Sequence, residues 1–208
     1  QQLSVQTGLS IATCNTLLND MEQSNEVIGE KRRLQDVGRE SVCYQINEEF
    51  EGFLCIYFEL LNGERRLTLH LLSAVGNIIE KIEKKCEFID YAVIANEIEH
   101  MLKQHNNISQ IIVGTPSIAE NGIIRHCDIA ELENVEIIRQ LEKQFHIPVY
   151  LENDMHFKAY GYYSKCGKED EIITLANFPA HILPGTASVH AGMILKGKNH
   201  VSVACTKD

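Results

Sequence analysis

The chain has 208 residues, of which 44% are hydrophobic and 23% are charged, and its formal net charge is −10 at pH 7. These values are typical of a soluble globular protein with one or two domains. The acidic balance excludes a protein that binds nucleic acid with its whole surface, but it allows a small local DNA-reading element. No run of about 18 apolar residues predicts a membrane span. The first residues do not form a secretion signal, so we expect a cytoplasmic protein.

Seven cysteines are scattered along the chain, and none forms a C-x-x-C pair. This odd, dispersed set predicts reduced thiols that serve as small buried apolar side chains. Both ends look cut, since Gln1 is not a natural start and Asp208 follows a glycine-containing hairpin without a closing element. We therefore expect a fragment of a longer protein.

Residues 3–24 predict two short helices. The first should end at Gly8, which suits a left-handed helix C-terminus, and Ser10 should cap the second. The apolar residues of the second helix follow helical spacing: Ile11, Cys14, Leu17, Leu18 and Met21. Two short helices joined at a glycine are typical of a helix-turn-helix, although any helical hairpin has the same pattern.

Residues 27–46 predict a β-hairpin with a polar, basic tip. Placed after a helix-turn-helix, such a hairpin is the wing of a winged helix. Phosphate contacts from a wing fix the register on DNA and make affinity depend on salt. The basic residues expected to make them are Lys31, Arg32, Arg33 and Arg39. The alternative is a solvated hairpin without a DNA role.

Three outward positions near the start of the second helix are expected to read bases: Thr13, Asn15 and Thr16. Asparagine can pair with adenine, and threonine can contact a thymine methyl group. This helix has no Arg or Lys, and the first 47 residues carry four basic and six acidic groups. Phosphate binding should therefore come mainly from the wing or from residues that precede this chain.

Residues 47–52 are an acidic linker, after which a second domain begins. An apolar strand is predicted over 53–61, a tight turn at Asn62-Gly63, an alternating strand over 66–72, and a third strand from Ile78. Three further helices are predicted over 89–105, 134–145 and 154–164, and strands over 108–113, 148–151, 172–175 and 193–195. In the first of these helices the expected apolar stripe is Ile89, Ala92, Val93, Ile98, Met101 and Leu102. Three antiparallel strands followed by αβαβα match half of an actin-like or ribonuclease-H-like core.

An Asn-Asp pair follows the strand that ends near Leu151 and opens the next helix. In α/β proteins this position commonly binds a small polar ligand. The amide of Asn153 can donate and accept hydrogen bonds, and the carboxylate of Asp154 can accept them or take a proton. Glu152 is a weaker candidate. The structural alternative is that Asp154 only caps the helix, with Asn153 in the turn.

Three segments together resemble the ROK family of bacterial sugar-responsive repressors and sugar kinases, over nearly the whole chain. I-I-V-G-T-P-S-I (111–118), followed by N-G-I-I (121–124), is similar to the family's V-G-x-P-G segment and its short hairpin. F-H-I-P-V-Y-L-E-N-D (145–154) is similar to F-G-x-P-V-x-x-x-N-D. V-G-R-E-S-V-C-Y-Q-I-N (37–47) is similar to the wing of the repressor branch, which kinases of the family lack.

The resemblance implies that Asn153 and Asp154 grip sugar hydroxyls. It also places Thr115 and Ser117 beside the cleft, where Ser117 stands in place of a glycine and narrows it. His126 and Cys127 lie on the loop after the short hairpin, where family members commonly offer sugar contacts. Here that likeness is loose, and exposed polar residues are the simpler expectation.

Two phosphate-binding loops of the family's kinases look degraded. Where a D-x-G-x-T loop is needed, residues 58–64 read F-E-L-L-N-G-E, so that the threonine is missing and Glu64 would repel phosphate. Where a G-T-G-x-G-x-G loop is needed, residues 186–192 read T-A-S-V-H-A-G, which puts side chains where backbone must approach phosphate closely. We therefore expect no ATP, no other cofactor and no kinase activity. The family's zinc cluster and E-x-G-H motif would lie beyond this chain, so no metal is expected.

The sequence thus predicts an α/β transcriptional regulator. A winged helix-turn-helix is expected over 1–47, and an actin-like or ribonuclease-H-like sugar-kinase-fold domain over 48–208, which comprises the N-terminal lobe and the start of the second lobe. The expected partners of the regulator are operator DNA, a sugar or sugar-derivative effector and a second copy of the chain, because two-fold operators are read by two-fold proteins. One alternative is a ROK sugar kinase that phosphorylates a hexose with ATP. Another is a degenerate module that makes only protein contacts.

Overall fold

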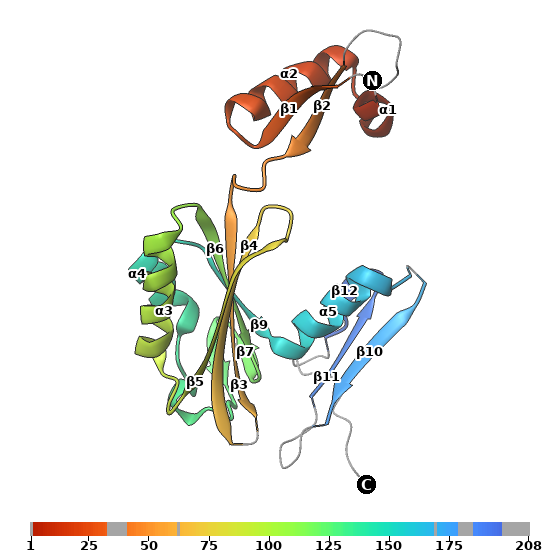
Figure 1. Cartoon of the computed structure of the whole chain (residues 1–208). Helices are drawn as coiled ribbons and strands as arrows, with labels where there is room; N and C mark the ends of the chain where they lie inside the picture. The colour runs from red at the N-terminus through yellow and green to blue at the C-terminus, as the bar shows by residue number, and fades with distance from the viewer. Residues whose placement is uncertain (1, 33–40, 62, 169, 179–184, 197–208) are drawn as a thin grey trace.

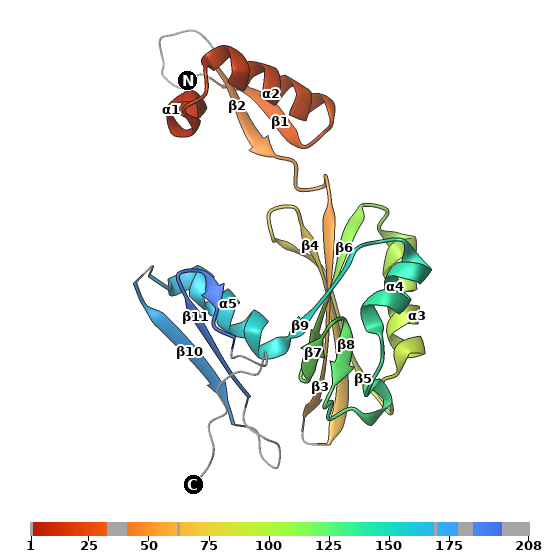
Figure 2. The same cartoon turned by 180° about the vertical axis from the view of Figure 1, so that it is seen from behind.

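The computed structural model describes residues 2–32, 41–61, 63–168, 170–178 and 185–196 (Figure 1). A small N-terminal unit leads into a central sheet. Two helices lie on one side of this sheet, and a further helix with a second sheet lies on its opposite side (Figures 1 and 2). None of the helices in these ranges is long and apolar enough to cross a membrane. The six cysteines within the described ranges are all free thiols.

The N-terminal unit consists of two helices and a two-stranded antiparallel hairpin: α1 (Gln2–Thr7), α2 (Ile11–Gln23), β1 (Val27–Arg32) and β2 (Ser41–Ile46). Gly8 ends α1 with a φ of +71°, as predicted. Ser10 caps α2, as predicted, and its hydroxyl accepts the Thr13 N–H at 3.1 Å. The tip of the hairpin, residues 33–40 with Arg33 and Arg39, lies outside the described residues.

The central sheet has five strands in the order β5-β4-β3-β6-β9. Their bounds are β3 (Gly52–Leu61), β4 (Glu64–Ser73), β5 (Ile78–Cys86), β6 (Ile108–Thr115) and β9 (Val149–Asn153). The first three pair antiparallel, and β6 and β9 continue the sheet parallel to β3, which confirms the predicted strand positions. Leu61 pairs with Glu64, as expected for a hairpin with a two-residue connection; the predicted turn residue Asn62 lies outside the described residues.

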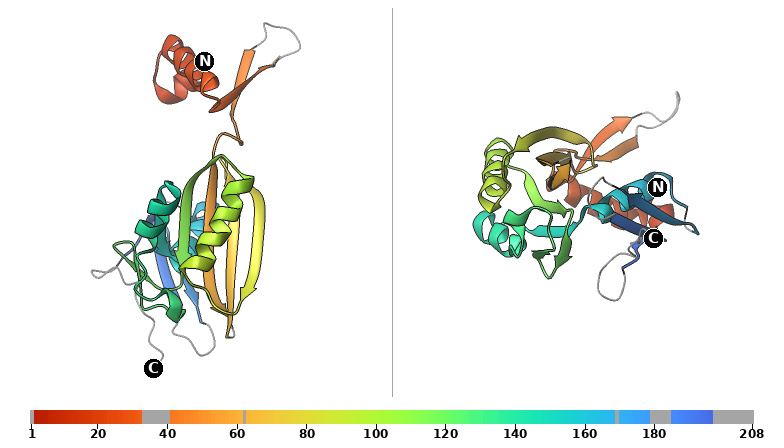
Figure 3. Two further views of the ribbon diagram at one scale, coloured as in Figure 1. Left: turned by 90° about the vertical axis from the view of Figure 1, so that its left-hand side faces the viewer. Right: turned by 90° about the horizontal axis from the view of Figure 1, so that it is seen from below.

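Helices α3 (Tyr91–Gln104) and α4 (Ile137–Phe145) cover one face of this sheet (Figure 3). Alternate residues of β3, β4 and β6 point toward them and form the main core, because side chains of a strand alternate between its two faces. The predicted stripe of α3 is partly wrong. Ala92 is exposed, whereas Ile94 and Ala95 are buried, because the helix begins at Tyr91 behind its Asp90 cap and turns those two residues toward the sheet.

The helix predicted from Asn134 begins only at Ile137. Asn134 has a φ of +64°, which a right-handed helix does not allow. Its backbone N–H donates to the Ile124 carbonyl at 2.8 Å. Residues 134 and 135 therefore lie alongside strand β8 (Ile123–Arg125), and the helix starts only after them. The short hairpin that the family likeness implies is present and consists of β7 (Ile118–Glu120) and β8. A single 3₁₀ turn (Ala130–Leu132) lies between β8 and α4.

A second layer begins with helix α5 (Asp154–Cys166), which packs on the three-stranded sheet β10 (Ile172–Asn177), β11 (Gly185–His190) and β12 (Met193–Ile194). The strand β11 was not predicted. Residues 186–190, expected at the position of a phosphate loop, instead pair antiparallel with β10, because Ala187 and Val189 face a small core under α5. The ring of Phe157 on α5 approaches Gly114 of β6, where a β-carbon would lie 3.3 Å from it.

The linker between the N-terminal unit and the central sheet is hydrogen-bonded at both ends. On one side the Asn47 amide donates to the Asn25 carbonyl at 2.8 Å. On the other, the Asn77 amide donates to the Glu48 carboxylate at 2.9 Å, and the Asn107 amide donates to the Glu49 carbonyl at 3.0 Å. Residues 47–49 are therefore attached to both the N-terminal unit and the end of the sheet.

Candidate functional site

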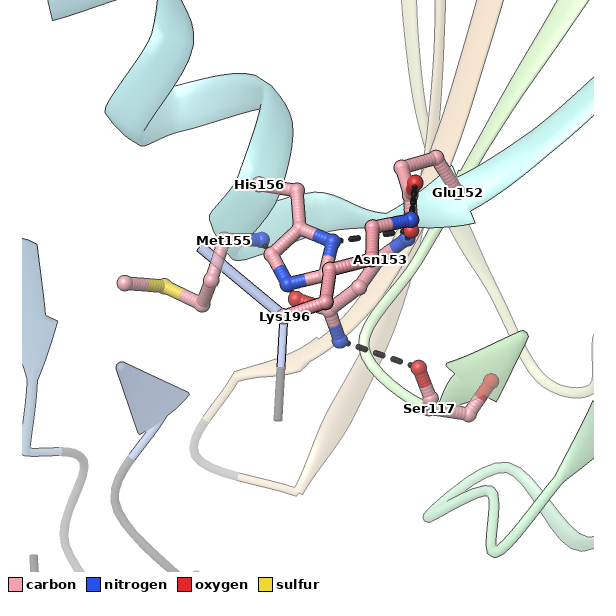
Figure 4. Close-up of polar contacts among 6 residues, drawn as sticks. All are labelled: Ser117, Glu152, Asn153, Met155, His156 and Lys196. Atoms are coloured by element: carbon pink, nitrogen blue, oxygen red, sulfur yellow. Dashed lines mark hydrogen bonds and ion pairs between the residues drawn. The ribbon is translucent and has the colours of Figure 1, made fainter. Parts of the chain in front are cut away.

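Asn153 is the last residue of β9 and the N-cap of α5 (Figure 4). Its side-chain oxygen accepts the Met155 N–H at 2.9 Å, and its amide nitrogen donates to the Ser117 carbonyl at 2.9 Å. The structure thus corrects the expected alternative, since Asn153 rather than Asp154 caps the helix. The side chain also ties the β9–α5 corner to the segment that follows β6.

Asp154 is the first residue of α5 and forms an ion pair with Lys158 at 2.6 Å, one helical turn later. The side chain of Asp154 is 16% exposed and that of Lys158 is 44% exposed. The carboxylate lies at the positive end of the helix dipole, which favours a negative charge there. It accepts hydrogen bonds, and a ligand hydroxyl could share it with the lysine.

Ser117 is brought to this corner but is only 3% exposed. Its hydroxyl lies 2.5 Å from that of Thr115, which is itself fully buried at the end of β6. Cys127, on the loop after the hairpin, also contacts the Ser117 side chain. Burial raises the pKa of the Cys127 thiol, and hydrogen bonds from the Ile129 backbone and the Ser117 side chain only partly oppose it, so the thiol stays protonated at neutral pH.

Glu152 has more partners than any other charged residue of the corner. Its Oε1 accepts the Asn153 N–H at 2.9 Å and the His156 ring Nδ1–H at 2.8 Å, and its Oε2 is paired with the Lys196 ammonium group (Figure 4). Burial alone would raise the pKa of Glu152. The hydrogen bonds from His156, Lys196 and the Asn153 backbone outweigh that effect and hold the pKa at about 2.

Sequence reasoning missed His156 and Lys196. His156 is 4% exposed, and its spacing of four residues from Glu152 is a signal that the sequence does carry. Lys196 follows β12 and is 44 residues from Glu152 along the chain, so that no local pattern joins the two. The pairing depends on the segment after β12 returning to the end of β9.

The residues expected to contact DNA lie on the surface of the N-terminal unit. Thr13, Asn15 and Thr16 are all exposed on α2. Lys31 is exposed on β1. The Arg32 guanidinium group is held by the Glu30 carboxylate, with its Nε at 2.9 Å, and would have to leave that partner to reach a phosphate.

Where the structure describes them, the two segments at the expected phosphate-loop positions lie in strands and tight turns. Glu64 directly follows the β3–β4 turn, and hydrogen bonds from Lys85 and then Arg66 lower the pKa of its carboxyl group, so it stays charged. Residues 186–190 form β11, and the tight turn at Ala191-Gly192, with φ of +47° and +74°, leads into β12.

A shallow hollow of about 580 Å³ lies elsewhere, between the tip of the β7–β8 hairpin and α4. It is lined by charged residues such as Glu136 and Arg139, and neither Asn153 nor Asp154 borders it. Among the described residues, no group of three or more His, Cys, Asp or Glu side chains is arranged to hold a metal ion. The Asn153 corner is the candidate site because its polar side chains lie where β9 ends and α5 begins.

Two replacements of Asn153 distinguish what each of its side-chain hydrogen bonds contributes to stability. Asn153→Ala removes both the helix cap and the link to Ser117, and should lower the free energy of unfolding by about 1–3 kcal/mol. Asn153→Ser keeps a capping oxygen and loses the donor to the Ser117 carbonyl without adding a charge, so it should cost less. Urea unfolding of both variants measures the difference, and equal losses would mean that the cap contributes nothing.

No family model matches this sequence, and no curated protein matches it. Solved structures do. A ROK-family transcriptional regulator, described as a homologue of the E. coli MLC protein, is similar with a TM-score of 0.70 and 20% identity, over 97% of this chain and 52% of that one. The chain thus spans about half the length of that regulator.

Sugar-binding proteins of the same family match a smaller part of the chain. A ROK hexokinase from Thermus thermophilus has a TM-score of 0.57 and 17% identity, over 71% of this chain and 49% of that one. A ROK-family protein from Streptococcus pneumoniae, solved in complex with sucrose, has a TM-score of 0.59 and 15% identity, over 72% of this chain and 50% of that one. The mixed α/β chain therefore has the fold of ROK-family regulators and sugar kinases.

Proposed function

We propose that the chain is part of a ROK-type transcriptional regulator that binds operator DNA through residues 1–47, acting as a winged helix-turn-helix. The observation that carries the proposal is the extent of the structural match. Similarity to the regulator over 97% of the chain includes most of residues 1–47, whereas the hexokinase matches 71%. The capped α2, with Thr13, Asn15 and Thr16 exposed, supports base reading by this helix.

The sugar effector would bind at the Asn153 corner of the kinase-like domain, residues 48–208. Asp154 offers a carboxylate at a helix N-terminus, and the corner joins the two sheets. Sugar recognition needs a few well-placed polar groups at such a junction. We assign the contacts with sugar hydroxyls to Asp154 and Asn153. The Ser117 carbonyl orients Asn153 by accepting a hydrogen bond from its amide.

The hydrogen-bonded linker would transmit the effect of the sugar to the DNA-binding unit. Glu48 and Glu49 are held by Asn77 and Asn107 at the end of the central sheet, and Asn47 is held by the α2–β1 turn. A shift of the sheet would therefore move the N-terminal unit as well. In a homodimer this would change the spacing of two DNA-binding units, and with it the affinity for a two-fold operator.

The experiment that tests the proposal is selection of DNA from a random duplex library by the full-length protein, followed by affinity measurements over a range of salt. We expect a two-fold sequence to be enriched, with affinity that falls as salt rises because phosphate contacts release counterions. Asn15→Ala should relax the preference at one base position, at a cost of about 1–3 kcal/mol. Lack of any sequence-selective, salt-sensitive binding would refute the regulator.

Removing Glu30 should strengthen DNA binding. Glu30→Gln frees the exposed Arg32 guanidinium from its carboxylate partner and removes one negative charge from the wing. Because exposed ion pairs are worth at most about 1 kcal/mol, the gain should reach about fivefold in affinity at low salt. Fluorescence anisotropy with a labelled duplex measures it. The control is Glu120→Gln, which removes a carboxylate near Arg125 on the β7–β8 hairpin. An equal gain in both variants would show that only net charge matters.

A sugar kinase is the second candidate, because several solved ROK kinases share the fold. It predicts ATP turnover with a hexose that disappears in Asp154→Asn, where the base would be lost. The charged Glu64 at the start of β4, and the pairing of residues 185–190 with β10, argue against phosphate cradles at those positions. Absence of turnover with a panel of hexoses would eliminate this candidate.

A further inference from the structure

We infer that Glu152 is a positioning residue rather than a sugar contact: together with His156 and Lys196 it fixes the Asn153-Asp154 corner that grips the ligand. This inference rests on the proposed sugar site and concerns how that site is held.

Both oxygens of the Glu152 carboxylate are already used. Oε1 accepts the Asn153 N–H and the His156 Nδ1–H, and Oε2 is paired with Lys196. An ionised carboxylate only accepts hydrogen bonds, so His156 must carry its proton on Nδ1 to make this contact. Three of the roughly four lone-pair sites of the carboxylate are therefore filled, and a sugar hydroxyl would have to share Oε2 with the Lys196 ammonium group.

The partners of Glu152 come from three parts of the chain. Asn153 belongs to β9, His156 to the first turn of α5, and Lys196 to the segment after β12. A single carboxylate therefore joins the edge of the central sheet to the helix and to the second sheet (Figure 4). Charge-assisted hydrogen bonds are about twice as strong as neutral ones, which suits a group that must hold a junction.

The hydrogen bond from the Asn153 N–H to the Glu152 carboxylate links Glu152 to the residues that are proposed to bind the ligand. It sets the orientation of the peptide between Glu152 and Asn153, and thus the direction of the Asn153 side chain toward Met155 and the Ser117 carbonyl. Asp154 follows immediately and takes its direction from the same corner. Loss of the carboxylate should loosen this corner while the cores on either side remain packed.

The test is amide hydrogen exchange measured by NMR on the ligand-free, ¹⁵N-labelled chain. Glu152→Gln and Lys196→Met should each speed exchange at the Asn153 and Met155 amides, by about tenfold for Glu152→Gln. The matched control is Glu80→Gln, which breaks another half-exposed carboxylate–histidine pair, Glu80 with His105 at 2.7 Å. That variant should leave both amides unchanged.

Binding of D-glucose, measured by calorimetry on the same chains, separates positioning from direct contact. If wild type binds D-glucose, Glu152→Gln and Lys196→Met should both weaken it, and Glu80→Gln should not. Weaker binding with unchanged exchange at Asn153 and Met155 would make Glu152 a direct contact and overturn the inference, as would equal effects of Glu80→Gln. If wild type does not bind D-glucose, the proposed site fails for that sugar, and the exchange data alone decide whether Glu152 holds the corner.

Discussion

The Asp154→Ala chain is expected to lose the stabilisation that the proposed sugar effector should give the wild type, while its own stability changes little. A carboxylate that accepts hydrogen bonds from ligand hydroxyls contributes about 1.5–3 kcal/mol, so its removal should weaken binding by about 10- to 100-fold. The ion pair with Lys158 is partly exposed and spaced i,i+4, and such pairs stabilise a helix by only about 0.3–0.5 kcal/mol. Thermal unfolding with and without D-glucose, other hexoses and sucrose measures both quantities.

Lys158→Met is the matched control for this prediction. It breaks the same ion pair but leaves the Asp154 carboxylate in place, so the sugar-induced shift should remain. If the shift disappears in Lys158→Met as well, the ion pair and not the carboxylate is what the ligand needs. If a shift persists in Asp154→Ala, the sugar binds elsewhere and the assignment of Asp154 is wrong.

The wild type should lose stability in acid through Glu152. The folded pKa of about 2 lies below the ordinary value of 4.5, so the carboxylate contributes its full stabilisation above pH 4.5 and loses it as the pH falls toward 2. With the side chain 28% exposed, the contribution is at most about 3 kcal/mol. Glu152→Gln should therefore unfold more easily than wild type at pH 7, and the difference should shrink steadily below pH 4.5. Urea unfolding at a series of pH values measures it.

Glu64→Gln is the control for this acid dependence. The pKa of Glu64 is also lowered, by hydrogen bonds from Lys85 and Arg66, but its side chain is 46% exposed, and water screens its interactions. Its replacement should change stability little at any pH. A difference between Glu152→Gln and wild type that stays constant from pH 7 to pH 3 would show that the charge of Glu152 is not what stabilises the fold.

Where the pattern was strong, the sequence predicted the elements well. The alternation in 66–72 and the apolar run in 53–61 predicted β4 and β3, and Gly8 and Ser10 predicted the end of α1 and the start of α2. Each of these signals is local, because the residues that carry it contact one another within a turn or across one hairpin. The family likeness added the fold of the domain, which the solved ROK structures support.

The errors arose where distant contacts override local preference. Helix α4 starts late because Asn134 first pairs with Ile124 of β8. Strand β11 was missed because its residues gain apolar burial only from α5, which no pattern within 185–190 reveals. At the site, Asp154 was considered as the helix cap, but the strand continues through Asn153, and Asn153 caps α5 instead.

The sequence by itself determined the strand and helix positions of the central sheet, the caps of the first helices and the place of the Asn-Asp pair at the end of a strand. These features depend on residues that are neighbours along the chain. Only the tertiary structure decided how that pair is held, through Ser117, which lies 36 residues from Asn153, and Lys196, which lies 44 residues from Glu152. Hydrogen bonds and ion pairs form between any groups that the fold brings within bonding distance, and the spacing of these residues along the sequence does not predict them.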